Sequence, residues 1–152
     1  MKVAVLMGSP RDRDKMAPAV STLGEFGVEV DERVMSAHRT PQVVADFSRQ
    51  ARAAGYAAVI CGAGLAAHLA GAVAANTTLP VVGVPLSGGA LNGVDALYAT
   101  VQMPSGVPVA TVGIDGAANA ALLAVQMLAI TDQALAHRLD EHRARRAAQG
   151  NP

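Results

Sequence analysis

Three side chains that could do chemistry together stand close in the sequence, at Ser36, His38 and Arg39. An apolar run ends just before them, and Thr40-Pro41 follow as the predicted N-cap and first residue of a helix. In an α/β protein such a strand-to-helix turn lies at the carboxyl edge of the sheet, where ligands bind. A hydroxyl, an imidazole and a forked guanidinium can hold an anion and move a proton beside it. The segment alone leaves a plain solvated turn open as the alternative.

Two glycine-containing segments add to this candidate site. Backbone N–H groups at Gly8-Ser9, with the helix N-terminus after them, suit a phosphate that Arg39 could also bind. Residues 64 to 71 are small and mostly apolar, which suits a pocket that excludes water. His68 is expected near the start of a helix there, either pointing into the pocket or buried for structural reasons.

The elements that position these residues follow from apolar runs alternating with helical periodicity. We expect strands at residues 3 to 7, 28 to 35, 57 to 61, 81 to 84 and 107 to 112. Helices are expected from the cap at Asp12 to Phe26, over residues 41 to 54, after a glycine turn at 62 to 64, up to Gln102, over 117 to 129, and after the cap at Thr131-Asp132.

This alternation predicts a three-layer α/β fold with a flavodoxin-like parallel sheet in the order 2-1-3-4-5. Helices cover both faces, and residues 131 to 152 form a C-terminal helical extension of a single domain spanning 1 to 152. The turns that follow the strands converge at one edge of the sheet.

Composition limits the possible functions. The chain has 152 residues, is 51% hydrophobic and only 16% charged, which indicates apolar surface buried between subunits. The formal net charge is zero, which disfavours nucleic acid and membrane partners. With two Tyr, two Phe and no Trp, a flavin clamped between aromatic rings is not expected. No apolar run suits a signal peptide or a membrane span, so a cytoplasmic protein is expected.

Several common sites are disfavoured. Cys61 is the only cysteine and is expected as a small buried residue, which excludes an internal disulfide and Cys-rich metal sites. The four His are far apart in sequence, so no metal is expected. Gly62-Ala63-Gly64 begins a weak dinucleotide fingerprint, but it follows the third strand and the next strand supplies no acid for a ribose hydroxyl. No organic cofactor is expected.

Several motifs taken together resemble the N5-carboxyaminoimidazole ribonucleotide mutase family of purine biosynthesis. They are Met7-Gly8-Ser9, Ser36-Ala37-His38-Arg39-Thr40-Pro41, Gly62-Ala63-Gly64 with Ala66-Ala67-His68-Leu69, Val101-Gln102-Met103-Pro104 with Gly106 to Thr111, and Asn119 to Ala124. The resemblance implies an isomerase that moves a carboxylate from the exocyclic nitrogen to C4 of an aminoimidazole ribonucleotide. It also implies a homo-octamer and a reaction that needs no cofactor.

The resemblance assigns roles residue by residue. His38 is the general acid and base, which protonates the departing nitrogen and later removes the C4 proton. Ser9, Asp12, Ser36 and Arg39 match positions that hold the ribose phosphate. Gly64, Ala66 and His68 match the wall around the base and carboxylate.

The chain also departs from the family pattern at Arg11, Arg13, Leu65 and Ala70. These differences keep a carboxylase using CO2 and aminoimidazole ribonucleotide, or a related mononucleotide, as the main alternative. Arg39 favours the mutase, since the carboxylase branch typically carries Lys there. A non-catalytic nucleotide-binding module is a third hypothesis.

Overall fold

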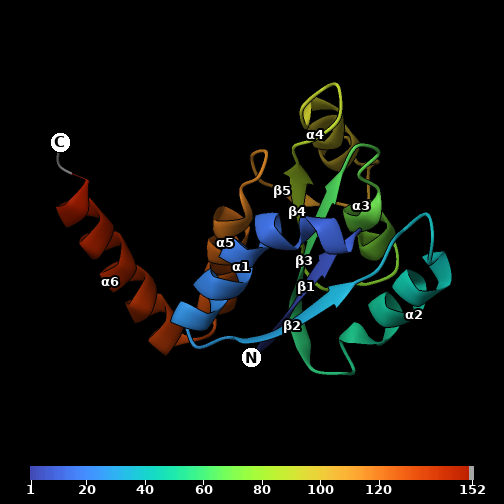
Figure 1. Cartoon of the computed structure of the whole chain (residues 1–152). Helices are drawn as coiled ribbons and strands as arrows, with labels where there is room; N and C mark the ends of the chain where they lie inside the picture. The colour runs from blue at the N-terminus through green and yellow to red at the C-terminus, as the bar shows by residue number, and fades with distance from the viewer. Residues whose placement is uncertain (151–152) are drawn as a thin grey trace.

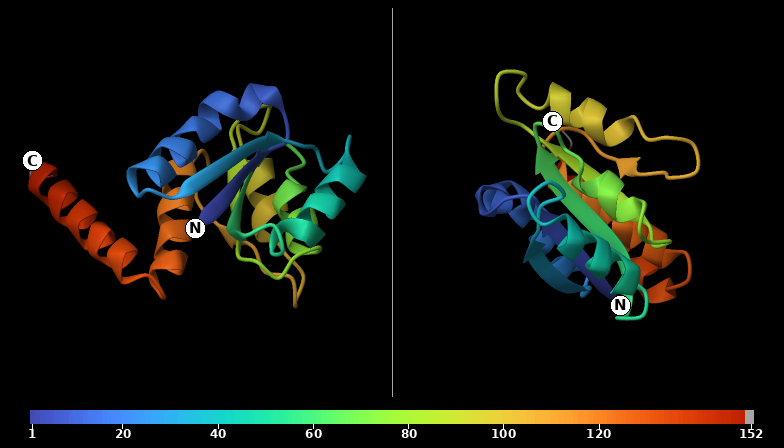
Figure 2. Two further views of the ribbon diagram at one scale, coloured as in Figure 1. Left: turned by 90° about the horizontal axis from the view of Figure 1, so that it is seen from below. Right: turned by 90° about the vertical axis from the view of Figure 1, so that its right-hand side faces the viewer.

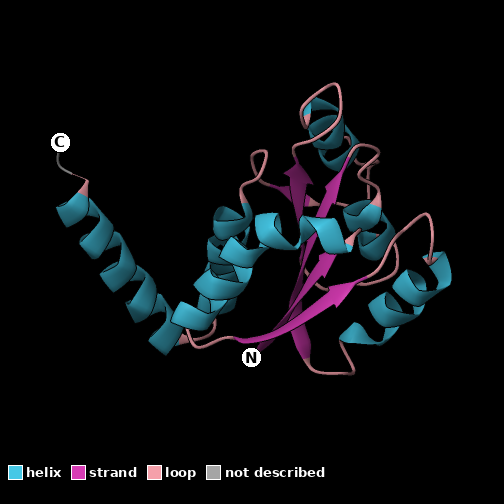
Figure 3. Ribbon diagram, viewed as in Figure 1, coloured by secondary structure: helices cyan, strands magenta, loops and turns pink. Residues whose placement is uncertain are grey.

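A single parallel sheet carries the site, and the computed structural model describes residues 1–150 of the chain around it. The strand order is β2-β1-β3-β4-β5 (Figures 1 and 3). The strands are β1 Lys2–Met7, β2 Glu29–Val34, β3 Tyr56–Gly64, β4 Val81–Leu86 and β5 Ala110–Thr111. The predicted order is therefore confirmed, and the point where the chain switches direction across the sheet lies between β1 and β3.

Helices cover both faces of this sheet (Figure 2). They are η1 Pro10–Asp12, a short 3-10 helix, and α1 Arg13–Glu25, α2 Pro41–Ala51, α3 Leu69–Ala74, α4 Val94–Val101, α5 Ala117–Ala129 and α6 Gln133–Gln149. Core residues of α1 and α5 pack on one face, and those of α2 and α3 on the other. The predicted three-layer arrangement is confirmed.

Strand β1 shows why a central strand of a parallel sheet has a continuous apolar sequence. Val3, Val5 and Met7 belong to the core under α1 and α5, whereas Ala4 and Leu6 belong to the core under α2 and α3. All five side chains are 0% exposed. Because both faces are covered, neither set of alternating positions can be polar.

Several predicted boundaries were wrong, among them the end of β4, which continues past Val84 to Leu86. Strand β3 continues through the expected glycine turn to Gly64, because Gly62 and Gly64 pair with β4 residues Val84 and Leu86. Strand β5 has only two residues instead of six, at a sheet edge where Pro108 has no N–H to donate to a ladder. Helix α2 ends at Ala51, and the remaining expected residues form a turn.

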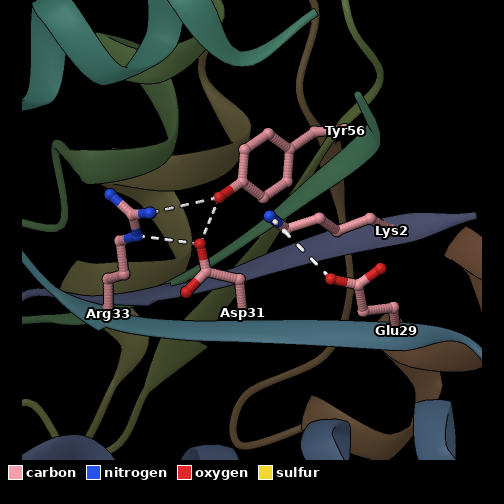
Figure 4. Close-up of polar contacts among 5 residues, drawn as sticks. All are labelled: Lys2, Glu29, Asp31, Arg33 and Tyr56. Carbon is pink, nitrogen blue, oxygen red and sulfur yellow. Dashed lines mark hydrogen bonds and ion pairs between the residues drawn. The ribbon is translucent and has the colours of Figure 1, made fainter. Parts of the chain in front are cut away.

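Strand β2 is the other edge, and a polar cluster fastens it to the sheet (Figure 4). Asp31 accepts hydrogen bonds from the Tyr56 hydroxyl and from Nε of Arg33, the latter at 2.8 Å. Lys2 Nζ lies 4.3 Å from the centre of the Tyr56 ring and 3.9 Å from a Glu29 carboxylate oxygen. Burial alone would raise the pKa of Asp31, but the Tyr56 hydrogen bond and the Arg33 contacts outweigh it and lower that pKa.

Helix α6 extends away from the body of the molecule (Figure 1). Its first turn is capped as predicted, since Oδ1 of Asp132 accepts from the backbone N–H groups of Ala134 and Leu135. Leu135 and Leu139 are buried, and Nη1 of Arg138 donates to the Phe26 carbonyl at 2.7 Å. Residues 151 and 152 of the predicted extension lie outside the described residues. Over residues 1–150, the helices are too short or too polar to cross a membrane.

Candidate active site

A cleft of about 960 Å³ lies at the carboxyl ends of the strands. Loops after β1, β2, β3 and β4 line it, which confirms the predicted convergence of these four turns. The turn after β5, at Asp115-Gly116, was predicted to join them but does not line the cleft. All eight site residues expected from the sequence line this one cleft: Ser9, Asp12, Ser36, His38, Arg39, Gly64, Ala66 and His68. The fold therefore places residues up to 59 positions apart around one space, at the switch point where α/β proteins bind ligands.

The loop after β1 presents a hydroxyl and a carboxylate. Oγ of Ser9 accepts from the Arg11 backbone N–H at 3.3 Å, which caps η1 and leaves the hydroxyl hydrogen free to donate. Asp12 is the N-cap of α1 by position, but its side chain makes no capping hydrogen bond, contrary to the prediction. Burial raises the pKa of Asp12, while the Ser9 backbone, Lys15 and Arg39 oppose that increase. Its carboxyl group is thus held among cations in the cleft.

The loop after β2 is held in shape by its own side chains. The Thr40 hydroxyl accepts from the Ser36 N–H at 2.9 Å and donates to the Ser36 carbonyl, instead of capping α2 as expected. Oγ of Ser36 accepts from the Arg39 N–H at 3.2 Å. Nη2 of Arg39 donates to the Gly8 carbonyl at 3.2 Å, which draws the guanidinium over the loop after β1. The cation is therefore positioned beside Ser9 and Asp12.

Two histidines from separate loops meet in the cleft. Nε2 of His38 lies 2.7 Å from Nδ1 of His68, with the rings at 80° and their centres 4.7 Å apart. His38 lies in the loop after β2, and His68 lies between β3 and α3. Strand β1 lies between β2 and β3 in the sheet, yet the two rings are in contact. The sequence placed His38 at this edge and left His68 either in the pocket or buried, and the family resemblance placed His68 in the wall of the site. Neither predicted that the two rings would contact each other.

The remaining wall is built from small residues at the end of β3 and in the loops after β3 and β4. It includes Gly64, Ala66, Gly88 and Gly89, with Leu65 between the first two. Small side chains let a ligand approach the backbone closely and offer few groups that bind water. The other residues that line the cleft carry hydroxyl, carboxylate and guanidinium groups.

A polar network centred on Ser87, which also lines the cleft, was not predicted from the sequence. Nζ of Lys15 donates to Oγ of Ser87 at 2.7 Å and also reaches the Ser87 carbonyl. The Ser87 N–H donates to Oδ1 of Asp115 at 2.9 Å. Burial alone would raise the pKa of Asp115, but the Ser87 hydrogen bonds and the Lys15 charge lower it. This network ties α1 and the turn before α5 to the loop after β4.

Cys61 is buried in β3, as predicted, and its burial raises the pKa of the thiol. A thiol in that state is a poor nucleophile. Within residues 1–150, no three His, Cys, Asp or Glu side chains gather closely enough to hold a metal ion.

Comparisons with known proteins place this geometry in context. A family model described as AIR carboxylase matches residues 2–149. N5-carboxyaminoimidazole ribonucleotide mutase from Brucella melitensis is 52% identical over 143 residues, covering 93% of this chain and 88% of the relative. The mutase of that name from Saccharolobus solfataricus is 51% identical over 138 residues, covering 91% and 87%. The crystal structure of Treponema denticola PurE has a TM-score of 0.89 at 29% identity, covering 97% of this chain and 92% of that one.

Proposed function

The chain belongs to the AIR carboxylase family, and we propose that it is the isomerase that converts N5-carboxyaminoimidazole ribonucleotide into 4-carboxy-5-aminoimidazole ribonucleotide in de novo purine biosynthesis. Curated relatives about half identical over more than nine-tenths of the chain carry the mutase name. The observation that carries the proposal is the position of His38 in the cleft that also holds Ser9, Arg39 and the small wall at Gly64 and Ala66.

His38 is the proposed proton donor and acceptor. It gives a proton to the exocyclic nitrogen as the N–C bond to the carboxylate breaks, and CO2 is released. Ring carbon C4 then bonds to the CO2 carbon, and His38 takes back the proton displaced from C4. His38 gives one proton and regains one, as an isomerisation with no net proton uptake requires.

The polar side of the cleft is the proposed phosphate and ribose side. The hydroxyls of Ser9 and Ser36 each accept from a backbone N–H, so each has its own hydrogen available for an anionic oxygen. Arg39 supplies a fixed charge, anchored on the Gly8 carbonyl. Arg11 lines the same side and adds a second cation. The carboxyl of Asp12 suits a ribose hydroxyl or a backbone N–H of the loop, rather than the phosphate itself.

The small wall is the proposed site of the base and of CO2. Gly64 and Ala66 offer backbone and methyl groups, and His68 places a ring nitrogen against His38. A water-poor wall favours decarboxylation because the charged carboxylate loses hydration before it becomes neutral CO2.

We also propose that the protein is a cytoplasmic homo-octamer, the assembly that the family resemblance implies. An exposed apolar stripe supports subunit contact: Leu91, Val94, Tyr98 and Val101 are 60%, 44%, 61% and 48% exposed along one side of α4 and the turn before it. Sedimentation velocity should show one large species. Tyr98→Lys together with Val94→Lys should reduce its mass, whereas Val43→Lys, at an exposed position of α2, should not. A monomeric wild type would contradict the octamer without touching the proposed reaction.

The reaction class is tested by offering wild-type protein two substrate sets. N5-carboxyaminoimidazole ribonucleotide without bicarbonate should give the 4-carboxy product rapidly. Aminoimidazole ribonucleotide with bicarbonate should react far more slowly at the same enzyme concentration. Rapid product formation only in the bicarbonate reaction would instead identify a carboxylase.

A further inference from the structure

Leu65 lies in the wall of the cleft with a left-handed backbone and an exposed apolar side chain. Its φ is +54°, in the left-handed region that glycine adopts freely and other L-residues rarely do. Its apolar side chain is 56% exposed and belongs to neither core cluster. Residues that persist despite strain and exposure point to function more than to stability.

The side chain of Leu65 spans two walls of the cleft. Leu65 follows β3 directly, and Gly89 lies in the loop after β4. A Cβ placed on Gly89 would lie 2.6 Å from Cδ2 of Leu65, so this methyl group rests against the Gly89 backbone. Gly88 and Gly89 have φ values of +150° and +64°, so the loop takes this path through conformations that favour glycine.

Leu65 is also distinct from the rest of the wall around it. Gly64, Ala66 and Gly89 are small, and Leu69, the other lining leucine, is 2% exposed and packed in the core. The exposed methyl groups of Leu65 are therefore the bulky apolar feature that this wall presents to a ligand.

We propose that Leu65, resting against Gly89, is a cover that keeps CO2 in the cleft between its release and its capture by the ring carbon. This inference rests on the proposed function. When the carbamate N–C bond breaks and His38 protonates the nitrogen, the products in the cleft are aminoimidazole ribonucleotide and CO2. If CO2 then escapes, no C–C bond forms, and His38 regains its proton from solvent. The net reaction becomes decarboxylation.

An apolar side chain suits this task. CO2 is small and carries no net dipole, so the cleft cannot hold it by charge and must retain it by excluding water and blocking exit. Methyl groups do both without binding the molecule tightly. The strained backbone of Leu65 is then the cost of presenting a side chain where glycine would fit the fold better.

The test measures where the carboxylate carbon goes. N5-carboxyaminoimidazole ribonucleotide labelled with ¹³C in its carboxylate is offered in a large pool of unlabelled bicarbonate, and the label in the product is compared with the label released. Enzyme-free decomposition is subtracted. Wild type should retain most label in the product, and Leu65→Gly should release at least threefold more label per product formed.

Two control variants distinguish loss of the Leu65 side chain from the effects of any substitution in this wall or at any left-handed residue. Leu65→Met keeps an apolar side chain of similar volume and should partition label as wild type does. Asn92→Gly changes another left-handed residue, with φ of +47°, outside the cleft lining, and should also leave partitioning unchanged. Leu65→Gly should melt at or above the wild-type temperature, since glycine relieves the strained φ.

The outcomes are distinguishable. Unchanged label partitioning in Leu65→Gly, with wild type active, overturns the cover and leaves the proposed function standing. A lower melting temperature for Leu65→Gly gives the side chain a structural role and also overturns the cover. A wild type that only releases label, or forms no product, overturns the proposed function and the cover with it.

Discussion

Nε2 of His38 lies 2.7 Å from Nδ1 of His68, which joins the loop after β2 to the residue that precedes α3. A hydrogen bond between two imidazoles needs one nitrogen to donate and the other to accept, so both facing nitrogens cannot carry protons at once. When His38 holds the transferred proton, Nδ1 of His68 can accept from it. His68 is therefore placed to orient the His38 ring by accepting this hydrogen bond.

This relationship predicts a rescue pattern at His68. His68→Leu removes the acceptor and should lower kcat about tenfold to a hundredfold. This is at or below the lower end of the roughly 10²–10⁴-fold contribution of a general acid or base, because His68 acts through His38. His68→Asn places an amide oxygen near the position of Nδ1 and should recover most of that loss. Steady-state kinetics measures both. Equal kcat for the Leu and Asn variants would show that the nitrogen contact does not matter.

Arg39 should act in binding rather than in proton transfer. Arg39→Ala removes a charged donor to the proposed phosphate and should raise KM about thirtyfold to a hundredfold, corresponding to about 2–3 kcal/mol, with a smaller change in kcat. Arg39→Lys keeps the charge but loses the fork, so its KM should fall between the two. Arg49→Ala removes an exposed cation of α2 that pairs with Asp46, outside the cleft lining, and as the control it should leave KM unchanged. A normal KM for Arg39→Ala would remove this residue from the binding site.

Gly62 should be intolerant of a side chain because of Met16. A Cβ at Gly62 would overlap the Met16 thioether, which is 0% exposed between α1 and the sheet. Gly62→Ala should therefore lower the free energy of unfolding by about 1–3 kcal/mol. Gly24→Ala is the matched control, since nothing lies within 4 Å of its added Cβ inside α1. The helical substitution should be neutral or stabilising by about 0.5–1 kcal/mol in urea denaturation. Equal effects of the two changes would contradict this packing argument.

The Asp31 cluster on edge strand β2 should make stability depend on pH. The pKa of Asp31 is lower in the folded chain than its ordinary value of 3.8. Its ionised form therefore contributes stability that is complete above about that value and is lost as the pH falls through the folded-state pKa. Asp31→Asn should cost about 1 kcal/mol at pH 7, and this difference should shrink below the ordinary carboxyl value.

Urea denaturation of wild type and Asp31→Asn across pH 2.5 to 7, a range set by the linkage argument, measures that difference. Asp46→Asn, an exposed carboxylate on α2, serves as the comparison and should change stability little at either extreme. A constant gap between wild type and Asp31→Asn across the whole range would contradict the assigned direction.

Periodicity and turn chemistry predicted the order of the sheet, the layers and the edge on which the site lies. Continuous apolar runs such as residues 3 to 7 admit few interpretations, because only a strand covered on both faces needs them. The convergence of Ser9, His38 and Gly64 then follows from parallel topology. The specific roles of these residues came from the resemblance and stay predictions.

The features that the sequence did not predict depend on contacts between distant residues. Gly62 and Gly64 suggest a turn locally, yet pairing with β4 makes them strand residues, and Met16 leaves no space for a side chain at Gly62. The His38–His68 contact and the Lys15–Ser87–Asp115 network each join segments that are distant in the sequence. No pattern of neighbouring residues predicts which distant segments come into contact. Thr40 likewise has the residue type and position of a helix cap, but its hydroxyl forms hydrogen bonds with the Ser36 backbone instead.

Single-turnover conversion of N5-carboxyaminoimidazole ribonucleotide, followed by stopped-flow absorbance without bicarbonate, tests the central claim most directly. Wild type should form the 4-carboxy product, and His38→Asn should slow that step by at least about a hundredfold. The variant should still bind aminoimidazole ribonucleotide with near wild-type affinity in calorimetry. Unimpaired conversion by His38→Asn, or no conversion by wild type, would contradict the proposed isomerase and its proton-transfer residue.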